Sequence, residues 1–507
     1  MNIQSKILFN TLTLYAKMIA TTIIALYLTR VVLKTLGADD FGLYNLIGGV
    51  IALLSFLNSA LMTSTQRFLS VSKGEKNINK EIDIFNSSII IHLVLSLLLV
   101  FILEIASLFL FDGFLNINSE RVDAAKIVYQ LMILSTVVTI IGVPYNAAIN
   151  ANEDLWFFAL IETICAVLKI FIIVLFHISS YDALITYTAW ITFISILNLF
   201  IKYVWCIRKY SECKHFKMNK SSDSIKKMLA FTGWNAFGGL ALIGRNQGVA
   251  ILLNIFLGTA INAVYGIANQ LNSQLIYFST MMTTSMTPQI MKSHGEGNNE
   301  RMLRLSFFTS KMAFFLSAVF AIPLLIEIDF ILKIWLGTVP EYTREFCMVM
   351  LLMFLVMQLY PGITRAIQAC GKIKSYEIIT AINLLMPLPV GYLLLYKGYP
   401  GYTVIYLMVL AQIMQMICAI FIAKKLIGLN RFAFVFYVIK AIFVFIISLV
   451  IGEFINNILN CNEILRFIEI VFISFIIFTS LYYILIFNNI EKQKIIHTFY
   501  NLVMKNK

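Results

Sequence analysis

Long apolar stretches recur along almost the whole chain, and they constrain its fold more than any other feature of the sequence. Of the 507 residues, 60% are hydrophobic, and the mean hydropathy is +0.85. A bilayer core is roughly 30 Å thick, so a helix needs roughly 20 apolar residues to cross it. Lipid cannot hydrogen-bond the backbone, which favours helices that satisfy their own peptide groups. The pattern predicts an all-α integral membrane protein.

Turn-forming and charged residues divide the apolar stretches into about 14 expected transmembrane helices. No connection between them is long enough to bury a core of its own, and the longest polar connection lies near 208–227. The stretch after Lys6 is too long for the apolar core of a signal peptide, so the first helix is expected to remain in the mature protein. The expected spans are 11–35, 41–70, 85–111, 123–148, 155–177, 183–207, 228–256, 261–290, 304–332, 344–369, 375–396, 400–425, 433–456 and 464–487.

Lysine and arginine are concentrated in alternate connections between these spans. The richest are the segments 67–80, 208–227 and 424–431, together with the C-terminal tail. The positive-inside rule places these connections and both termini in the cytoplasm. Topology signals and contacts with anionic lipid headgroups explain the net charge of +13. Membrane lipids are therefore expected partners, and no nucleic-acid partner is expected.

Motifs for catalysis or cofactor binding are missing from the sequence. It contains no phosphate loop of the form GxxxxGK followed by Ser or Thr, which argues against an ATPase. Its seven cysteines form no CxxC pair, and its five histidines lack the spacing of a metal site. We expect no cofactor, no metal and no enzymatic activity.

An internal repeat organises the expected helices. A shift of 217 or 218 positions pairs Pro144 with Pro361 and Asn150 with Gln368. Each half then contains six spans, so both halves have the same orientation and form parallel bundles, which can rock to give alternating access. A shift of 221 positions pairs Leu36-Gly37 with Leu257-Gly258, Tyr44 with Tyr265, Thr63-Ser64 with Thr284-Ser285, Gly74-Glu75 with Gly295-Glu296, and Asn77 with Asn298.

The expected domains follow from this repeat. The N-terminal six-helix bundle is expected at 1–215 and the C-terminal six-helix bundle at 222–427. Two additional transmembrane helices are expected within 430–490, followed by a cytoplasmic tail at 491–507.

Three short segments, combined with this layout, resemble a known family. They are GADDFG at 37–42, TQRF at 65–68 and PYNAAINA at 144–151. The first twelve helices are similar to the Wzx-like lipid-linked oligosaccharide flippases, which themselves resemble the MATE exporters and the lipid II flippases. The resemblance implies that a polyprenyl-diphosphate-linked oligosaccharide is moved across the bacterial cytoplasmic (inner) membrane by alternating access without ATP hydrolysis. It also implies a role in surface polysaccharide or O-antigen biosynthesis, with polysaccharide assembly proteins as partners.

Ionisable residues inside spans are costly and are therefore candidates for function. Arg245 is the strongest candidate, because it lies near the middle of its span, beside Asn246. In this interpretation its charge offsets that of the diphosphate. The alternative is a close helix contact through Gly244 and Gly248, with Arg245 paired to a carboxylate such as Glu162 or Glu104.

Further candidates lie on the first two helices of each half. Lys17 and Arg30 share the first helix and point about 140° apart, so they are not expected to line one face together. Asn45 and Gln270, on the second helices, are candidates for hydrogen bonds to sugar hydroxyls, although contacts between helices explain most such residues.

Cavity charge separates the two leading hypotheses. An exporter of cationic compounds, like the cation-coupled MATE group, needs acidic lining residues, whereas an anionic diphosphate needs basic ones. The first helices of the two halves contain Lys17, Arg30 and Arg245 and no carboxylate, which favours the flippase. A polymerase or ligase acting on the same lipid-linked sugars is the third alternative.

Overall fold

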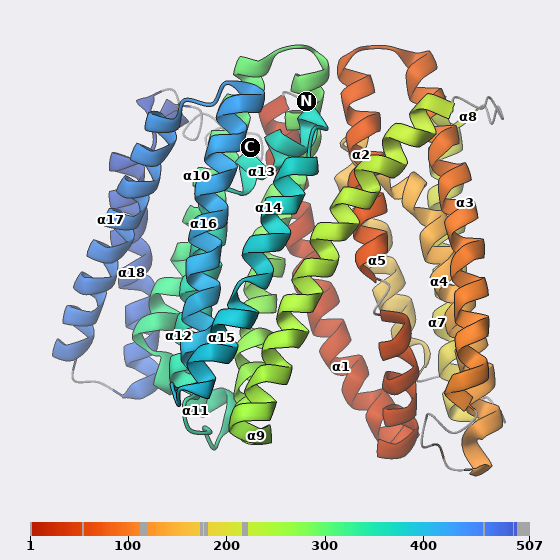
Figure 1. Ribbon diagram of the computed structural model, residues 1–507, viewed down its shortest axis with the longest axis horizontal. Coiled ribbons are helices and arrows are strands. Elements are labelled where there is room, and N and C mark those ends of the chain that lie inside the picture. Colours follow the sequence, from red (N-terminus) through yellow and green to blue (C-terminus); the bar gives the residue numbers. More distant parts are fainter. Residues whose placement is uncertain are drawn as a thin grey trace, which may run out of the picture. The chain divides into compact units, whose positions relative to one another are not determined.

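The computed structural model describes residues 3–52, 55–111, 117, 119–172, 176, 181–214, 222–459, 462–489 and 491–493. Every regular element within these ranges is helical (Figure 1), which confirms the predicted fold class. The described helices pack into two compact units. The N-terminal unit comprises residues 8–239 and 295–297, and the C-terminal unit comprises residues 1–7, 240–294 and 298–507.

The N-terminal unit is organised around helix α4. This helix packs against α2, α3 and α7, and the aromatic side chains of Phe85 and Tyr145 meet edge to face in its core, with ring centroids 5.6 Å apart. The helices of this unit are α1 (Ile3–Ala52), α2 (Ser55–Gly74), α3 (Ile78–Phe109), the short helix η2 (Ser119–Arg121), α4 (Val122–Ala151), α5 (Leu155–Ile170), α7 (Ala183–Lys209), α8 (Ser211–Lys214) and the first part of α9 (Ser222–Gly295).

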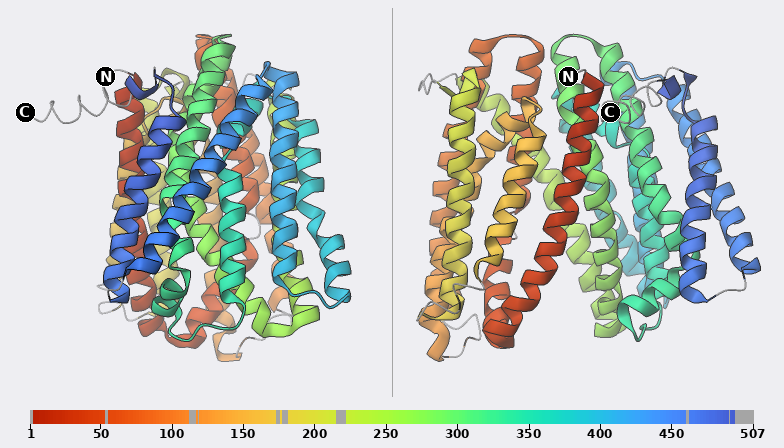
Figure 2. Two further views of the ribbon diagram at one scale, coloured as in Figure 1. Left: turned by 90° about the vertical axis from the view of Figure 1, so that its left-hand side faces the viewer. Right: turned by 180° about the vertical axis from the view of Figure 1, so that it is seen from behind.

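The C-terminal unit is organised around helix α10, which contacts α12, α13, α17 and α18 (Figure 2). A second group of contacts joins α16 to α12, α13, α14 and α15. The helices that complete this unit are α10 (Asn299–Ile326), α11 (Ile328–Leu336), α12 (Thr343–Gln358), α13 (Pro361–Cys370), α14 (Lys374–Leu385), α15 (Pro387–Tyr396), α16 (Tyr402–Ile427), α17 (Arg431–Ile458) and α18 (Glu463–Leu485).

Local structure recurs at the positions that the sequence repeat pairs. Gly37 interrupts α1 with φ 78° and Gly258 interrupts α9 with φ 80°, a backbone region that glycine enters without a Cβ clash. The side chain of Asn77 accepts a hydrogen bond from the backbone NH of Lys80, as an N-cap of α3. Asn298 caps α10 in the same way. The parallel superposition of complete halves stays a prediction, as do the domain boundaries.

The number of membrane-spanning helices differs from the expected count. Ten described helices are long and apolar enough to cross a membrane, or eleven if the bent pair α12 and α13 is one span. Two expected spans, 228–256 and 261–290, lie within α9, and the described part of α5 has only 16 residues. The expected span 41–70 is divided between α1, which is counted only over Phe9–Gly37, and α2, which is not counted. These three features lower the count, although all the expected spans overlap helical segments. Part of the 208–227 connection and most of the 491–507 tail lie outside the described residues.

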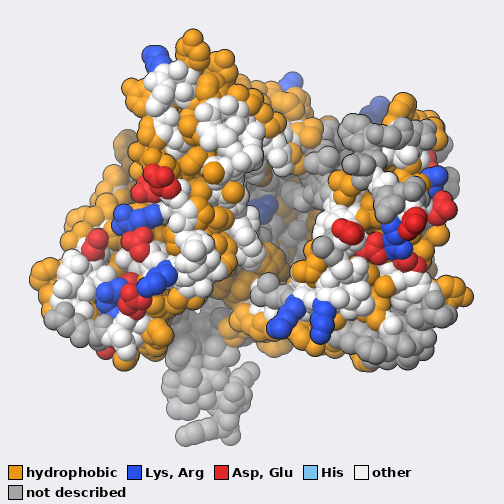
Figure 3. All heavy atoms as spheres, turned by 90° about the horizontal axis from the view of Figure 1, so that it is seen from below, with side chains coloured by type: hydrophobic (Ala, Val, Ile, Leu, Met, Phe, Trp, Pro, Cys, Tyr) orange, Lys and Arg blue, Asp and Glu red, His pale blue; other side chains and the backbone are white. Residues whose placement is uncertain are grey.

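Charged side chains of both signs are interspersed at one end of the helices in each unit (Figure 3). In the N-terminal unit, Arg121 donates hydrogen bonds to Asp40 and Asp182, and Asp182 also caps α7. The hydrogen bond to Asp182 is the main reason that the pKa of Arg121 is raised. Burial is the largest single effect on the pKa of Asp182 and acts to raise it. The hydrogen bond from Arg121, the charge of Arg121 and the hydrogen bonds from two backbone NH groups together outweigh burial, so the net pKa is lowered. The side chain of Arg121 therefore joins the starts of α4 and α7 to the segment of α1 that follows the break at Gly37.

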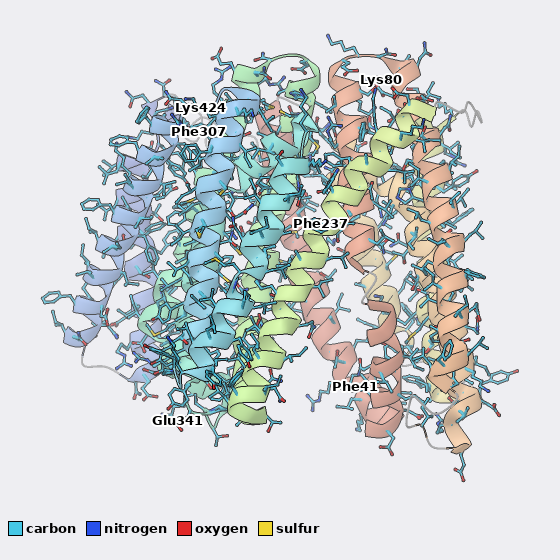
Figure 4. The ribbon with its side chains drawn as sticks, viewed as in Figure 1. Phe41, Lys80, Phe237, Phe307, Glu341 and Lys424 are labelled. Carbon is cyan, nitrogen blue, oxygen red and sulfur yellow. The ribbon has the colours of Figure 1, made fainter. Side chains whose placement is uncertain are left out.

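The orientation of the C-terminal unit can be tested at its two ends. Lys424 and Glu341 lie at opposite ends of this unit (Figure 4), and both are exposed. The positive-inside rule predicts that Lys424 faces the cytoplasm and Glu341 the outside. In a variant without other cysteines, Glu341→Cys should react with a membrane-impermeant thiol reagent added to intact cells, and Lys424→Cys should react only after the cells are opened. The reverse pattern would contradict the predicted topology.

Candidate functional site

A cluster of charged side chains lies inside the N-terminal unit, where α1, α5 and α7 meet. The Nζ atom of Lys202 on α7 is 2.6 Å from Oε1 of Glu162 on α5. The side-chain amide of Asn198, one turn before Lys202, donates to the same oxygen at 3.1 Å. Lys202 is 3% exposed, and Glu162 and Lys202 each lie about 10 Å from the near end of their helix, at 1.5 Å per residue. The ion pair therefore lies well within the helical part of the unit, with Lys202 buried and Glu162 partly exposed.

Lys17 of α1 completes this cluster. Its Nζ lies 4.5 Å from the centroid of the Phe158 ring, and Nζ of Lys202 lies 4.9 Å from the same centroid. Among the described residues, the ammonium of Lys17 forms no hydrogen bond and no ion pair, and the Phe158 ring is its closest charge-stabilising contact. The cluster therefore contains two ammonium groups and one carboxylate, and it has one positive charge in excess.

Arg245 occupies a polar region of the C-terminal unit. Its side chain is 4% exposed, and Nε and Nη2 donate to Oδ1 of Asn246 at 3.1 and 3.0 Å. The hydroxyl of Tyr265 donates to the backbone carbonyl of Asn246 at 3.4 Å. Tyr265 and Tyr360 are close enough to interact electrostatically with the guanidinium. Within the described part of the chain, no carboxylate pairs with Arg245.

The alternative interpretation of Arg245 proposed a close helix contact and a carboxylate partner, and the structure shows the contact but not the partner. Gly244 and Gly248 do make a close helix contact, since a Cβ built on Gly248 would lie 2.8 Å from the Leu388 side chain. The suggested carboxylate partners are engaged elsewhere: Glu162 binds Lys202, and Glu104 accepts a hydrogen bond from the side chain of Gln130.

Neutral polar side chains extend the polar region around α16. Gln412 donates to the hydroxyl of Tyr360, and Asn383 donates to Oε1 of Gln415 at 3.0 Å. Gln415 in turn donates to Thr380. These groups hydrogen-bond one another inside the unit, which is how buried polar side chains are normally accommodated. The region offers amides and hydroxyls beside a buried cation.

The other predicted candidates lie apart from these two polar regions. Arg30 and Gln270 are exposed and have no hydrogen bond within the described residues. Asn45 is exposed, and its side chain donates to the backbone carbonyl of Phe41 in its own helix. The structure therefore places Arg245 beside Asn246, assigns Lys17 to the cluster of the N-terminal unit, and leaves Arg30, Asn45 and Gln270 at exposed positions. It does not test the roles of these residues.

Sequence reasoning missed several members of the two polar regions. Lys202 belongs to the ionisable residues inside spans that the sequence marks as candidates, but Asn198, four residues before it, was missed. Gln412 and Gln415, which lie three apart on another apolar span, were also missed. Both spacings place the two side chains on the same helix face, a signal that was present in the sequence.

The comparisons with known proteins support a transporter fold. The family model described as MatE matches residues 247–393. No curated protein matches the sequence. An outward-facing multidrug resistance MATE family transporter of the MOP superfamily is 14% identical, with 84% of this chain and 96% of that chain covered and a TM-score of 0.71. MATE in a bent conformation is 16% identical, with the same coverage and a TM-score of 0.68.

A third similar structure is a MOP superfamily transporter from Pyrococcus furiosus, described as having a binding pocket of reverse polarity that suggests a different function. It is 15% identical, with 84% of this chain and 96% of that chain covered and a TM-score of 0.72. At these identities the likeness concerns the fold. The chain therefore has the fold of MATE transporters and the multi-pass helices of an integral membrane protein.

Proposed function

We propose that this protein is a flippase that moves a polyprenyl-diphosphate-linked oligosaccharide across the bacterial cytoplasmic membrane by alternating access. The fold of MATE transporters supports the transport part of the proposal. The resemblance of the segments at 37–42, 65–68 and 144–151 to Wzx-like flippases supports the substrate. Polysaccharide assembly proteins and membrane lipids are the proposed partners, and both termini are proposed to lie in the cytoplasm.

The surroundings of Arg245 distinguish an anionic substrate from a cationic one. Burying a charge within a membrane-spanning helix is costly, and such a charge is usually paired within the protein. Arg245 is 4% exposed and bonds only to the neutral amide of Asn246 within the described residues. An anionic substrate group would supply the missing counter-charge, whereas a cationic substrate would add to the unfavourable charge. The arrangement therefore favours a diphosphate over the cationic compounds of the alternative, a MATE-like exporter.

The neighbouring groups fit the remainder of such a substrate. The guanidinium presents a planar fork of donors that matches two phosphate oxygens. Its bonds to Asn246 would be exchanged for stronger bonds to charged oxygens. The amides of Gln412 and Gln415 can exchange their present hydrogen bonds for bonds to sugar hydroxyls. Because these groups would only bind and release the substrate, no covalent bond in the substrate needs to break.

Replacing Arg245 with alanine should reduce export of surface glycan about tenfold, the effect of losing about 1.4 kcal/mol of substrate stabilisation. Arg245→Lys should lose less, because it keeps the charge but not the planar fork. The measurement is the amount of surface glycan in a strain that depends on this protein, at matched protein levels. Arg304→Ala is the control, since Arg304 is exposed and pairs only loosely with Glu300.

Wild-type glycan levels in the Arg245→Ala strain would refute the role of this residue. If glycan export is unchanged while resistance to cationic amphipathic compounds is lost, the exporter hypothesis replaces the flippase. Retention of both activities would leave Arg245 with a packing role beside Gly244 and Gly248.

A further inference from the structure

The charged cluster of the N-terminal unit contains more charge than packing requires. Asn383 and Gln415 join their two helices by a neutral hydrogen bond of 3.0 Å. Since a neutral amide pair is enough to join α14 to α16, a helix contact of this kind does not require the ions Lys17, Glu162 and Lys202.

The balance of charge in the cluster is incomplete. Lys202 is paired with Glu162 at 2.6 Å, and Lys17 faces the ring of Phe158 without a carboxylate of its own. Attraction to a ring face compensates the charge of an ammonium only in part. The cluster is therefore able to take one more negative charge, held between two ammonium groups that already lie over one ring.

The cluster is also open enough for a ligand to reach it. The Glu162 side chain is 30% exposed and Lys17 is half-buried, whereas Lys202 is almost fully enclosed. A ligand can therefore approach Lys17 and Glu162 while Lys202 provides a fixed cation behind them. Glu162 pairs with Lys202 and would therefore compete with an anionic ligand for this lysine.

We propose that Lys17, Lys202 and Phe158 form a binding site for a singly charged oxyanion, and that Glu162 competes with this ligand for the lysines. Ammonium groups recognise carboxylate and phosphate oxygens equally well as point charges. Within the proposed function, on which this step rests, the ligand is an acidic group of the transported lipid-linked glycan: a sugar carboxylate or a phosphate.

Two substitutions separate this proposal from a purely structural ion pair. Glu162→Gln removes the competitor and should tighten anion binding roughly tenfold, which corresponds to about 1.4 kcal/mol. A structural pair predicts the opposite, because the buried Lys202 and the half-buried Lys17 would then lack a counter-ion. Lys17→Met keeps the pair between Lys202 and Glu162 and should abolish anion binding. Lys440→Met is the control, since Lys440 lies over Phe436 in the C-terminal unit.

The measurement is the unfolding temperature of the purified full-length protein as phosphate, glucuronate or chloride is added at constant ionic strength. Phosphate and glucuronate should stabilise the wild type and the Lys440→Met variant more than chloride does, and should stabilise Glu162→Gln most. Equal effects of phosphate and glucuronate would indicate a general oxyanion site, and a preference would name the acidic group. Stabilisation only in bilayers containing phosphatidylglycerol would assign the site to lipid headgroups and overturn the glycan assignment.

Two results would overturn the anion site. One is a Lys17→Met variant that responds to phosphate as the wild type does. The other is a Glu162→Gln variant that folds but gains no response. If Glu162→Gln does not fold, Lys17→Met decides alone. The unfolding assay involves no transport, so the anion site can be refuted while the flippase assignment, which is tested at Arg245, stands. Equally, the flippase assignment can be refuted while the anion site stands.

Discussion

Replacing Gly362 with alanine should destabilise the C-terminal unit by about 3 kcal/mol, at the upper end of the cost of overpacking. A Cβ built at this position would lie 2.0 Å from the backbone carbonyl oxygen of Ser306 and 3.0 Å from Oγ of Ser310. The backbone NH of Gly362 also donates to that hydroxyl. Because the nearest atom belongs to the backbone of α10, a side-chain rotation cannot relieve the clash. Helix α13 must move away from α10.

The unfolding temperature of the purified protein measures this effect. Gly266→Ala is the matched control, since Gly266 lies in α9 with no atom within 4 Å of the added carbon. Alanine there should be neutral or slightly stabilising, because it favours the helix. If Gly362→Ala unfolds at the same temperature as the Gly266→Ala control, the close approach of α13 and α10 is wrong.

The helices were predictable from the sequence because hydropathy is a local property. The expected spans 400–425, 433–456 and 464–487 correspond closely to α16, α17 and α18, which are strongly apolar over most of their length. The expected span 344–369 was less successful, since it is two helices, α12 and α13, that are bent by 46°. Pro361 begins the second helix, where its ring favours a helix start and cannot continue a preceding one.

The partners of the buried charges were not predictable in the same way. That Arg245 is buried follows from its position near the middle of an apolar span, and the structure agrees. Its neighbours do not follow, because they depend on which helices pack together. Glu162 and Lys202 are 40 residues apart and meet only because α5 packs against α7. A single sequence shows which charged residues lie inside the spans of a membrane protein, but it does not show which of them form ion pairs.

Breaking the ion pair between Arg466 and Glu327 should be among the most destabilising single changes in the C-terminal unit. Glu327 is 3% exposed at the end of α10, and Arg466 near the start of α18 donates to both of its oxygens, at 2.7 and 3.0 Å. Removing one partner of a buried pair costs about 3 kcal/mol or more, because the other charge is left without compensation. Arg466→Ala should therefore lower the unfolding temperature strongly, and Arg466→Lys should lower it less.

A double variant distinguishes this pair from a loss of packing by the long arginine side chain. Glu327→Gln in the Arg466→Ala background removes the stranded carboxylate, so it should recover most of the lost stability. Lys333→Ala is the control, because Lys333 and Glu463 are exposed at this end of the unit and exposed pairs contribute little. If the double variant is no more stable than Arg466→Ala alone, the arginine acts through packing. Recovery would mean instead that the unpaired Glu327 carboxylate causes the loss, since a buried charge without a partner is costly.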